Sequence, residues 1–208
     1  MVKTSIVRVA DNVLAEAETL RQTALDGKFH HPKDVVGWRM PPVRVPGAGA
    51  RIERLFGVKI TRWHGSKESC TLFLAFDRGR RRERIQIHSD TPPNAITLVL
   101  YLNHAAPAGT GTSLWRHRKT GLTSLPSLQE ARAAGFKGGR EALDDWIADA
   151  LWAVNGDRRK WQEVVRVENV FNRGVMYRGG LFHSATGHFG ENPNNGRIYG
   201  LFQFDIAD

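Results

Sequence analysis

The pattern of apolar and polar residues along the chain predicts strands over most of its length. Segments rich in β-branched and aromatic residues are the ones expected to pair as strands. They are residues 5–9, 58–63, 70–76, 84–88, 95–102, 165–171, 174–177, 181–184 and 197–204. Because these segments are short and numerous and helices are few, the expected fold is mainly β with flanking helices, a β-sandwich or jelly roll.

Helical periodicity is clear near the start of the chain. Asp11 is the expected N-cap of an alanine- and leucine-rich helix over about residues 11–26, which Gly27 ends. Residues 51–56 form a second, short predicted helix. Between the two helices, the histidine- and proline-rich residues 29–46 are expected to form a structured loop on the surface of the domain.

A second helical region interrupts the strands. Ser127 and Glu130 have the spacing of a capping box, which begins a helix. Over residues 140–154, apolar residues recur at three- and four-residue spacing, as one buried helix face requires. The sequence therefore predicts a helical insertion over about residues 127–163, within a single domain that covers residues 1–208.

Composition indicates a globular protein with a sizeable core. Charged residues make up 25% and apolar residues 41% of the 208-residue chain. No apolar run approaches membrane-spanning length, and the first residues lack the apolar segment of a secretory signal. Cys70 is the only cysteine, which excludes an intrachain disulfide. We therefore expect a cytoplasmic protein with no membrane contact, and the oligomeric state stays open.

The net charge of +9 points to a nucleic-acid partner or to an anionic substrate. Much of the excess lies in the arginine-rich residues 78–84, between two predicted strands. No aromatic residue interleaves these arginines, as base stacking would favour. We therefore expect residues 78–84 to form the solvated tip of a hairpin, and nucleic acid is the less favoured partner.

Two histidines and one aspartate form the most informative pattern in the chain. In residues 84–90, strand alternation places His88 and Asp90 on one face, as two ligands of one metal require. His183 follows the apolar start of a later predicted strand. Two histidines and one carboxylate leave three coordination positions open, which is the arrangement of non-haem Fe(II) oxygenases. His188 is the alternative second histidine, but it leads into a predicted loop.

The last predicted strand carries a polar face. Arg197 and Tyr199 alternate there with apolar residues, so they share one side of the strand. If that side lines a cavity rather than solvent, the planar guanidinium of Arg197 suits the far carboxylate of 2-oxoglutarate, which it can bind through two parallel hydrogen bonds.

Four stretches of the sequence resemble the Fe(II)/2-oxoglutarate-dependent dioxygenases, particularly the prolyl-hydroxylase-like branch. They are Ile-His-Ser-Asp at 87–90 with Leu-Val-Leu-Tyr-Leu-Asn at 98–103, Gly-Thr-Gly-Thr-Ser-Leu at 109–114, Met-Tyr-Arg-Gly-Gly-Leu-Phe-His-Ser at 176–184, and the closing strand at 197–205. The likeness spans about residues 58–205 and is specific in motif order. It departs from many members in a longer loop after His183 and in the helical insertion.

This resemblance implies a double-stranded β-helix fold and a set of site residues. His88, Asp90 and His183 would bind Fe(II), and Arg197 would pair with the side-chain carboxylate of 2-oxoglutarate. Tyr101 matches a tyrosine that adds a hydrogen bond to that carboxylate in some members; its alternative role is that of a core aromatic residue.

The expected activity is hydroxylation with O₂ of an amino acid, a peptide side chain or another small metabolite. Halogenating relatives lack the carboxylate that Asp90 supplies. One alternative is a non-catalytic metal- or ligand-binding β-sandwich. A nucleic-acid demethylase is a further alternative, but residues 198–203 lack the second arginine of that branch.

Substrate selectivity is expected in the loops at the mouth of the cavity. These are residues 29–46, the turn over residues 104–119 and residues 187–196. Two pairs within them place an apolar wall beside a cation, which suits an amphipathic or acidic substrate: Trp38 with Arg39, and Trp115 with Arg116. The alternative is that both tryptophans pack the loops against the protein.

Overall fold

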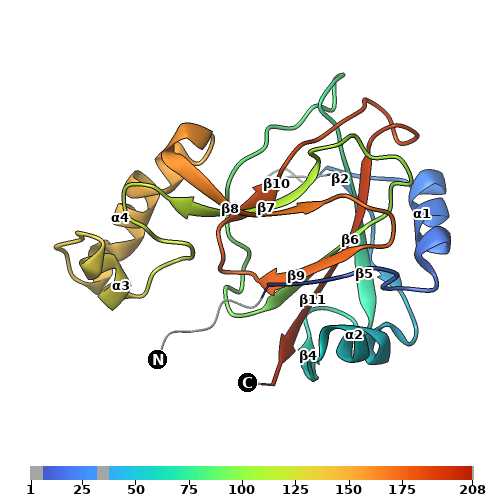
Figure 1. Cartoon of the computed structure of the whole chain (residues 1–208), viewed down its shortest axis with the longest axis horizontal. Coiled ribbons are helices and arrows are strands. Elements are labelled where there is room, and N and C mark those ends of the chain that lie inside the picture. The colour runs from blue at the N-terminus through green and yellow to red at the C-terminus, as the bar shows by residue number, and fades with distance from the viewer. Residues whose placement is uncertain (1–6, 32–37, 208) are drawn as a thin grey trace.

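The computed structural model describes residues 7–31 and 38–207, and two antiparallel sheets dominate it (Figure 1). The large sheet is 8-stranded, with the order β1-β9-β6-β11-β5-β2, while β3 pairs with β5 and β4 with β11. Its strands are β1 (Val7–Ala10), β2 (Trp38–Arg39), β3 (Val43–Arg44), β4 (Ile60–Trp63), β5 (Ser69–Ala75), β6 (Ile96–Tyr101), β9 (Gly174–Arg178) and β11 (Arg197–Ile206). The second sheet is 3-stranded, β10-β7-β8, with β7 (Gly111–His117), β8 (Trp161–Glu168) and β10 (His183–Ala185). The predicted fold class, a mainly β jelly roll with flanking helices, is confirmed.

Alternation along β11 divides the large sheet into an outer and an inner face. Ile198, Phe202 and Phe204 are buried in the main apolar cluster, which covers the outer face. The helices α1 (Ala17–Asp26) and α2 (Ala48–Phe56) contribute Leu20, Ile52 and other residues to this cluster and lie on that side of the sheet (Figure 1). Since one face is sealed by helices, the polar residues of β11 are turned toward the second sheet.

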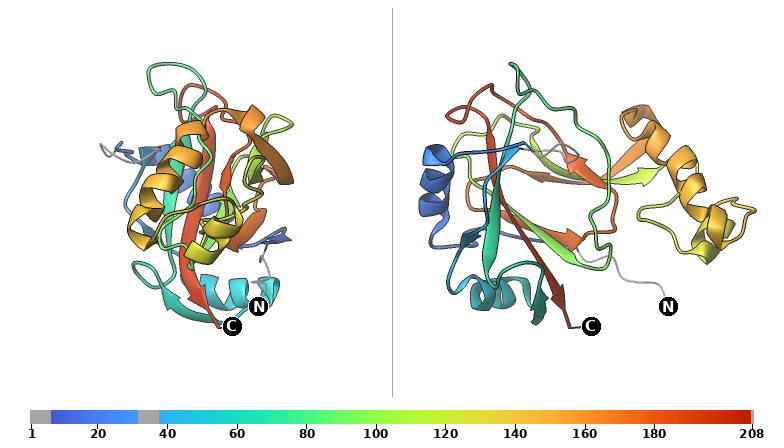
Figure 2. Two further views of the ribbon diagram at one scale, coloured as in Figure 1. Left: turned by 90° about the vertical axis from the view of Figure 1, so that its left-hand side faces the viewer. Right: turned by 180° about the vertical axis from the view of Figure 1, so that it is seen from behind.

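The helical insertion lies at the opposite end of the molecule from α1 (Figure 2). It contains α3 (Leu128–Ala133) and α4 (Leu143–Ala150), with 3₁₀ turns at Arg140–Ala142, Trp152–Val154 and Arg158–Lys160. The predicted capping box at Ser127 and Glu130 is confirmed. The insertion has its own apolar cluster, in which Leu143 and Ile147 pack with residues of the small sheet such as Trp161.

The first helix begins later than predicted. Its first residue is Ala17, because the residues near Asp11 are used in other contacts. The carboxylate of Asp11 accepts a hydrogen bond from Arg173 Nε at 2.6 Å, and Asn12 turns the chain with a φ of 55°. Asp11 therefore fixes the chain to the sheet instead of capping a helix.

Two segments differ from the predicted strands. Residues 84–88 form no strand; His88 alone among them is bridged, to His183. Conversely, residues 111–117 of the predicted turn 104–119 form β7, the central strand of the small sheet. The small polar residues of this segment resemble a turn in composition. In the structure residues such as Ser113 are buried and hydrogen-bonded across the sheet, which allows them to lie in a strand.

The predicted loop over residues 29–46 contributes two short strands, β2 and β3, that pair with β5. Residues 5–6 of the first predicted strand and residues 32–37 of this loop lie outside the described part of the chain. None of the helices in residues 7–31 and 38–207 has the length and apolar character needed to cross a membrane.

Candidate metal centre

The structure brings His88, Asp90 and His183 together. One potential ligand atom from each lies within 4.8 Å of the others. Asp90 Oδ1 is 3.4 Å from His183 Nε2 and 3.9 Å from His88 Nε2. Although His88 lies in an extended segment rather than a strand, its backbone pairs with that of His183 in both directions, at 2.9 Å and 2.8 Å. This bridge holds the two rings side by side.

Hydrogen bonds to the backbone orient both imidazoles. Nδ1 of His88 is 3.0 Å from the carbonyl oxygen of Gln86, and Nδ1 of His183 is 2.8 Å from that of Leu181. A carbonyl only accepts, so each Nδ1 carries a proton, and whenever the ring is neutral its Nε2 has a free lone pair. The two lone pairs are then free on the side of Asp90, which is the arrangement typical of metal-binding histidines.

Asp90 is oriented in a comparable way. Thr97 Oγ1 donates to its Oδ2 at 2.6 Å, which leaves Oδ1 for the histidines. The backbone N–H of Asp90 donates to the carbonyl oxygen of Gly179 at 2.7 Å. Thr97 therefore fixes the orientation of the Asp90 carboxylate through the oxygen that does not face the histidines. It was not predicted, although alternation with Val99 and Tyr101 on β6 places all three on the inner face.

The surroundings favour the protonation states that metal ligands need. Although half of the His88 side chain is open to solvent, the nearby protein desolvates the ring and, with repulsion from His183, lowers the pKa of His88 to about 4. Burial raises the pKa of Asp90, but the charge and hydrogen bond of His183 and the hydroxyl of Thr97 outweigh it and lower the pKa to about 2. A neutral His88 and an ionised Asp90 result at neutral pH.

The three residues lie on the wall of a cavity of about 590 Å³, a size typical of small-molecule sites. The inner face of the large sheet forms one wall, through Phe73 of β5 and Tyr199, Leu201 and Gln203 of β11. Tyr177 of β9, which was not predicted, lies with its ring centroid 4.7 Å from that of His183. The apolar residues of this wall limit the access of water to the three polar side chains.

Arg197 is buried in the same cavity, with an exposed fraction of only 3%. Its guanidinium carbon is 4.9 Å from the centre of the Tyr199 ring and 5.9 Å from that of Tyr101. Its Nε has no hydrogen-bond partner in the described part of the chain. A buried arginine with an unpaired N–H is costly unless an anion accepts from it. The residue therefore fits a carboxylate-binding position.

Tyr101 lies beneath Arg197 and is fully buried. Its hydroxyl donates to Thr112 Oγ1 at 2.8 Å and lies 3.4 Å from the carbonyl oxygen of Val167. Among the described residues that line the cavity, Tyr199 and Thr112 are present and Tyr101 is not. The ring of Tyr101 thus packs in the core, and its hydroxyl is already engaged.

His188 lies in the cavity but outside the group formed by the other two histidines and Asp90. Its Nδ1 is buried and finds no partner in residues 7–31 and 38–207. Burial, together with repulsion from Arg197 and Arg158, lowers the pKa of His188 to about 3. The ring is therefore neutral and available as a hydrogen-bonding group at the cavity wall.

The residues expected to select the substrate separate into two groups. Arg39 lines the cavity, and Trp38 beside it packs against His31 and under Arg81. Trp115 and Arg116 belong to β7 and not to a loop at the mouth, so their placement there was wrong. The Trp115 side chain is buried against the helical insertion and donates from Nε1 to Ser184 Oγ at 3.0 Å. Arg116 is exposed and is absent from the described cavity lining.

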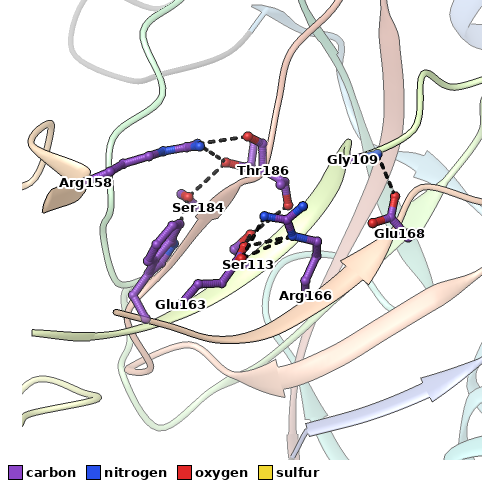
Figure 3. Close-up of polar contacts among 10 residues, drawn as sticks. Gly109, Ser113, Arg158, Glu163, Arg166, Glu168, Ser184 and Thr186 are labelled. Atoms are coloured by element: carbon purple, nitrogen blue, oxygen red, sulfur yellow. Dashed lines mark hydrogen bonds and ion pairs between the residues drawn. The ribbon is translucent and has the colours of Figure 1, made fainter. Parts of the chain in front are cut away.

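A polar network on the small sheet supports the chain on the far side of His183 (Figure 3). Ser113 Oγ of β7 is 2.7 Å from Thr186 Oγ1 and donates to Glu163 of β8, whose carboxylate also pairs with Arg166. Arg158 Nη2 donates to the carbonyl oxygen of Thr186 at 2.9 Å and lies 3.3 Å from that of Ala185. These bonds fix the segment directly after His183.

The fold is shared with solved structures of 2-oxoglutarate-dependent enzymes. HygX from Streptomyces hygroscopicus, with nickel and 2-oxoglutarate bound, is 12% identical and has a TM-score of 0.50 over 97% of this chain and 83% of its own. The non-haem α-ketoglutarate-dependent carbocyclase SnoK from nogalamycin biosynthesis is 15% identical, with a TM-score of 0.51 over 96% and 80%. The epimerase SnoN, in complex with Fe³⁺, α-ketoglutarate and nogalamycin RO, is 14% identical, with a TM-score of 0.52 over 96% and 78%. At these identities the likeness shows the fold alone.

The chain belongs to DUF6445, a family of unknown function whose model matches residues 2–199. A comparison with curated proteins finds no match.

Proposed function

We propose that this protein is an Fe(II)- and 2-oxoglutarate-dependent oxygenase. His88, Asp90 and His183 hold the iron, and Arg197 binds the far carboxylate of 2-oxoglutarate. The observation that carries this proposal is the convergence of three ligand atoms within 4.8 Å on the wall of a cavity that also holds a buried arginine with an unpaired Nε. A metal and a carboxylate together satisfy both groups.

The side chains fit Fe(II) by their chemistry as well as their positions. Two imidazole nitrogens and one carboxylate oxygen are the donor set of non-haem Fe(II) oxygenases. Their Nε2 lone pairs are made available by the backbone carbonyls of Gln86 and Leu181, and Oδ1 of Asp90 is left available by Thr97. When bound, Fe(II) with 2-oxoglutarate and O₂ supplies an oxidant able to cleave a C–H bond, with succinate and CO₂ as co-products.

The protein positions and shields the reactants. The guanidinium of Arg197 lies near the rings of Tyr101 and Tyr199, which pack against it and limit its motion, and its planar fork suits a two-pronged bond to a carboxylate. Burial raises the pKa of Tyr199 to about 12, against the opposing effect of Arg197, so this tyrosine remains a neutral wall at physiological pH. Tyr101 supports the arginine from below rather than donating to the co-substrate.

The expected outcome is hydroxylation of an amino acid, a peptide side chain or another small metabolite, since Asp90 supplies the carboxylate that halogenating enzymes lack. Membership of the prolyl-hydroxylase-like branch stays a prediction. The fold also serves a carbocyclase and an epimerase among the structures compared above. Hydroxylation is therefore proposed from the ligand set and not from the fold.

Succinate formation from 2-oxoglutarate tests the proposal. The Fe(II)-loaded protein should convert 2-oxoglutarate to succinate in air. Some conversion should occur even without the substrate, although slowly, because the reaction needs no protein group beyond those that hold the iron and 2-oxoglutarate. His183→Ala should abolish the conversion, and it should also lose stoichiometric metal binding in an anaerobic titration. His104→Ala is the matched control, since this exposed ring pairs only with Glu18 and Phe171 in the described structure.

Two outcomes would contradict the proposal. Metal binding without any succinate formation would indicate the alternative, a non-catalytic metal-binding protein of the same fold. Normal iron binding by His183→Ala together with its loss in His188→Ala would show that His188 is the second ligand.

A further inference from the structure

A second arginine of the cavity also has buried N–H groups for which the described part of the chain offers no acceptor. Arg39 lines the cavity, and both its Nε and its Nη2 are buried with no partner among residues 7–31 and 38–207. Its guanidinium carbon lies 5.8 Å from the centre of the Phe73 ring, which offers no oxygen or nitrogen acceptor to these donors. Nothing described in the proposed iron and 2-oxoglutarate site accounts for these donors.

The sheet register places Arg39 apart from Arg197. Arg39 of β2 is paired with Phe73 of β5, and Phe73 is paired with Tyr199 of β11, so these three residues form one row across the inner face. The Phe73 and Tyr199 rings stack at 5.1 Å between the strands. Arg197 lies two positions before Tyr199, opposite Ala75. The two arginines therefore stand at different ends of one aromatic floor.

Among the described residues that line the cavity, the formal charges leave one cation unmatched. In the proposed complex, the two charges of Fe(II) and the charge of Arg197 balance Asp90 and the two carboxylates of 2-oxoglutarate. Of the remaining charged residues described in the lining, Arg39 and Arg84 are positive and Glu83 is negative. Glu83 lies 3.3 Å from His31 Nε2. One positive charge is left over, which suits one further anionic group.

We infer that Arg39 binds an anionic group, a carboxylate or a phosphate, of the molecule that the enzyme oxidises. The identity of that molecule as the substrate rests on the proposed function, whereas anion binding by Arg39 does not. Arg81 stacks on Trp38 with its guanidinium carbon 4.4 Å from the ring, which holds the arginine-rich residues 78–84 beside β2. The cations there attract an anion toward the cavity.

Anion titration of the Mn(II)- and 2-oxoglutarate-loaded protein tests this inference. The probes are inorganic phosphate, phenylacetate and the neutral control phenylacetamide, and calorimetry measures the affinity of each for the protein. Wild type should bind phosphate or phenylacetate and not the amide. Arg39→Gln should weaken that binding by about tenfold or more, because it removes the charge-assisted donors. Arg80→Gln, an exposed arginine of the 78–84 run, is the matched control and should stay within about twofold.

The relative affinities of phosphate and phenylacetate distinguish the two sources of the anion. Equal affinity in wild type and Arg39→Gln, or no binding of either anion to wild type, would overturn the inference. If 2-oxoglutarate fails to bind while phosphate still depends on Arg39, the proposed function fails and the anion site stands.

Thermal unfolding separates ligand binding from a structural role. Two buried donors without an acceptor among the described residues cost stability, so Arg39→Gln and Arg39→Met should unfold at a temperature no lower than that of wild type. This result is expected of a residue that serves ligand binding, because its unpaired donors lower the stability of the ligand-free protein. A fall of several degrees in both variants would show that Arg39 supports the fold, and the inference would be wrong.

Discussion

At the scale of single residues, the candidate site depends on hydrogen bonds made by groups that never contact a ligand. The carbonyl oxygens of Gln86 and Leu181 set the two imidazole tautomers, and the Thr97 hydroxyl holds Asp90. Such contacts are worth 10- to 100-fold in metal affinity in proteins of this kind, as an order of magnitude. These supporting hydrogen bonds therefore hold the three candidate ligands in place before a metal binds.

Replacing Thr97 by valine tests this support. Thr97→Val keeps the shape of the side chain and removes the donor to Asp90 Oδ2, so the carboxylate is free to rotate and its pKa rises. We expect Mn(II) affinity to fall by about tenfold in a competition titration. Thr71→Val is the control, because Thr71 lies on β5 of the same sheet, away from Asp90. Unchanged affinity in Thr97→Val would show that the carboxylate needs no such support.

Alternation in the sequence was enough to place pairs of candidate site residues on common faces. His88 and Asp90 share a face, and Arg197 and Tyr199 share another, because side chains two apart point the same way in extended backbone. Thr97 was missed, since a threonine on an otherwise apolar strand resembles an ordinary β-former. Arg39 was predicted from its place beside Trp38, but its unpaired donors are visible only once β2 is paired with β5.

At the scale of elements, the two mispredicted segments have physical explanations. Residues 84–88 alternate like a strand, but in the described part of the chain their only β-pairing is the isolated bridge at His88, which fixes the candidate ligand itself. β7 has the glycine and small polar residues of a turn, yet its Ser113 and Trp115 side chains are satisfied across the small sheet. In both segments the tertiary hydrogen bonds, and not the local sequence preference for strand or turn, therefore determine the secondary structure.

The segment after β10 offers a test at this scale. Arg158 clamps the carbonyl oxygens of Ala185 and Thr186, just after His183. Arg158→Met keeps an apolar stem over Trp115 and deletes the donors, so the strand should open more often. We expect faster hydrogen exchange of the β10 amides. We also expect Mn(II) affinity to fall by roughly several-fold to tenfold, which is the lower end of the range for contacts that support metal ligands.

Arg159→Met is the matched control for this change. Arg159 is the adjacent residue, and it pairs with Asp157 while 90% of its side chain is exposed. If Arg158→Met and Arg159→Met give the same exchange rates and affinity as wild type, the clamp does not position His183.

At the scale of the whole molecule, the site lies where the two layers of the jelly roll meet. One apolar cluster seals the outer face of the large sheet with α1 and α2, and a separate cluster joins the small sheet to the helical insertion. Their packing leaves the inner face of the large sheet to form the cavity wall. The fold class followed from the number of short alternating segments, whereas the pairing of β7, β8 and β10 into a second sheet required the structure.

The proposed co-substrate site can be tested through the binding of 2-oxoglutarate to the Mn(II)-loaded protein, measured by calorimetry. We expect one 2-oxoglutarate per chain, much weaker binding without the metal, and a loss of affinity of about tenfold to a hundredfold in Arg197→Gln with metal binding retained. Succinate, which lacks the 2-oxo group, should bind more weakly than 2-oxoglutarate. If the affinity for 2-oxoglutarate depends on neither the metal nor Arg197, the cavity is not the co-substrate site.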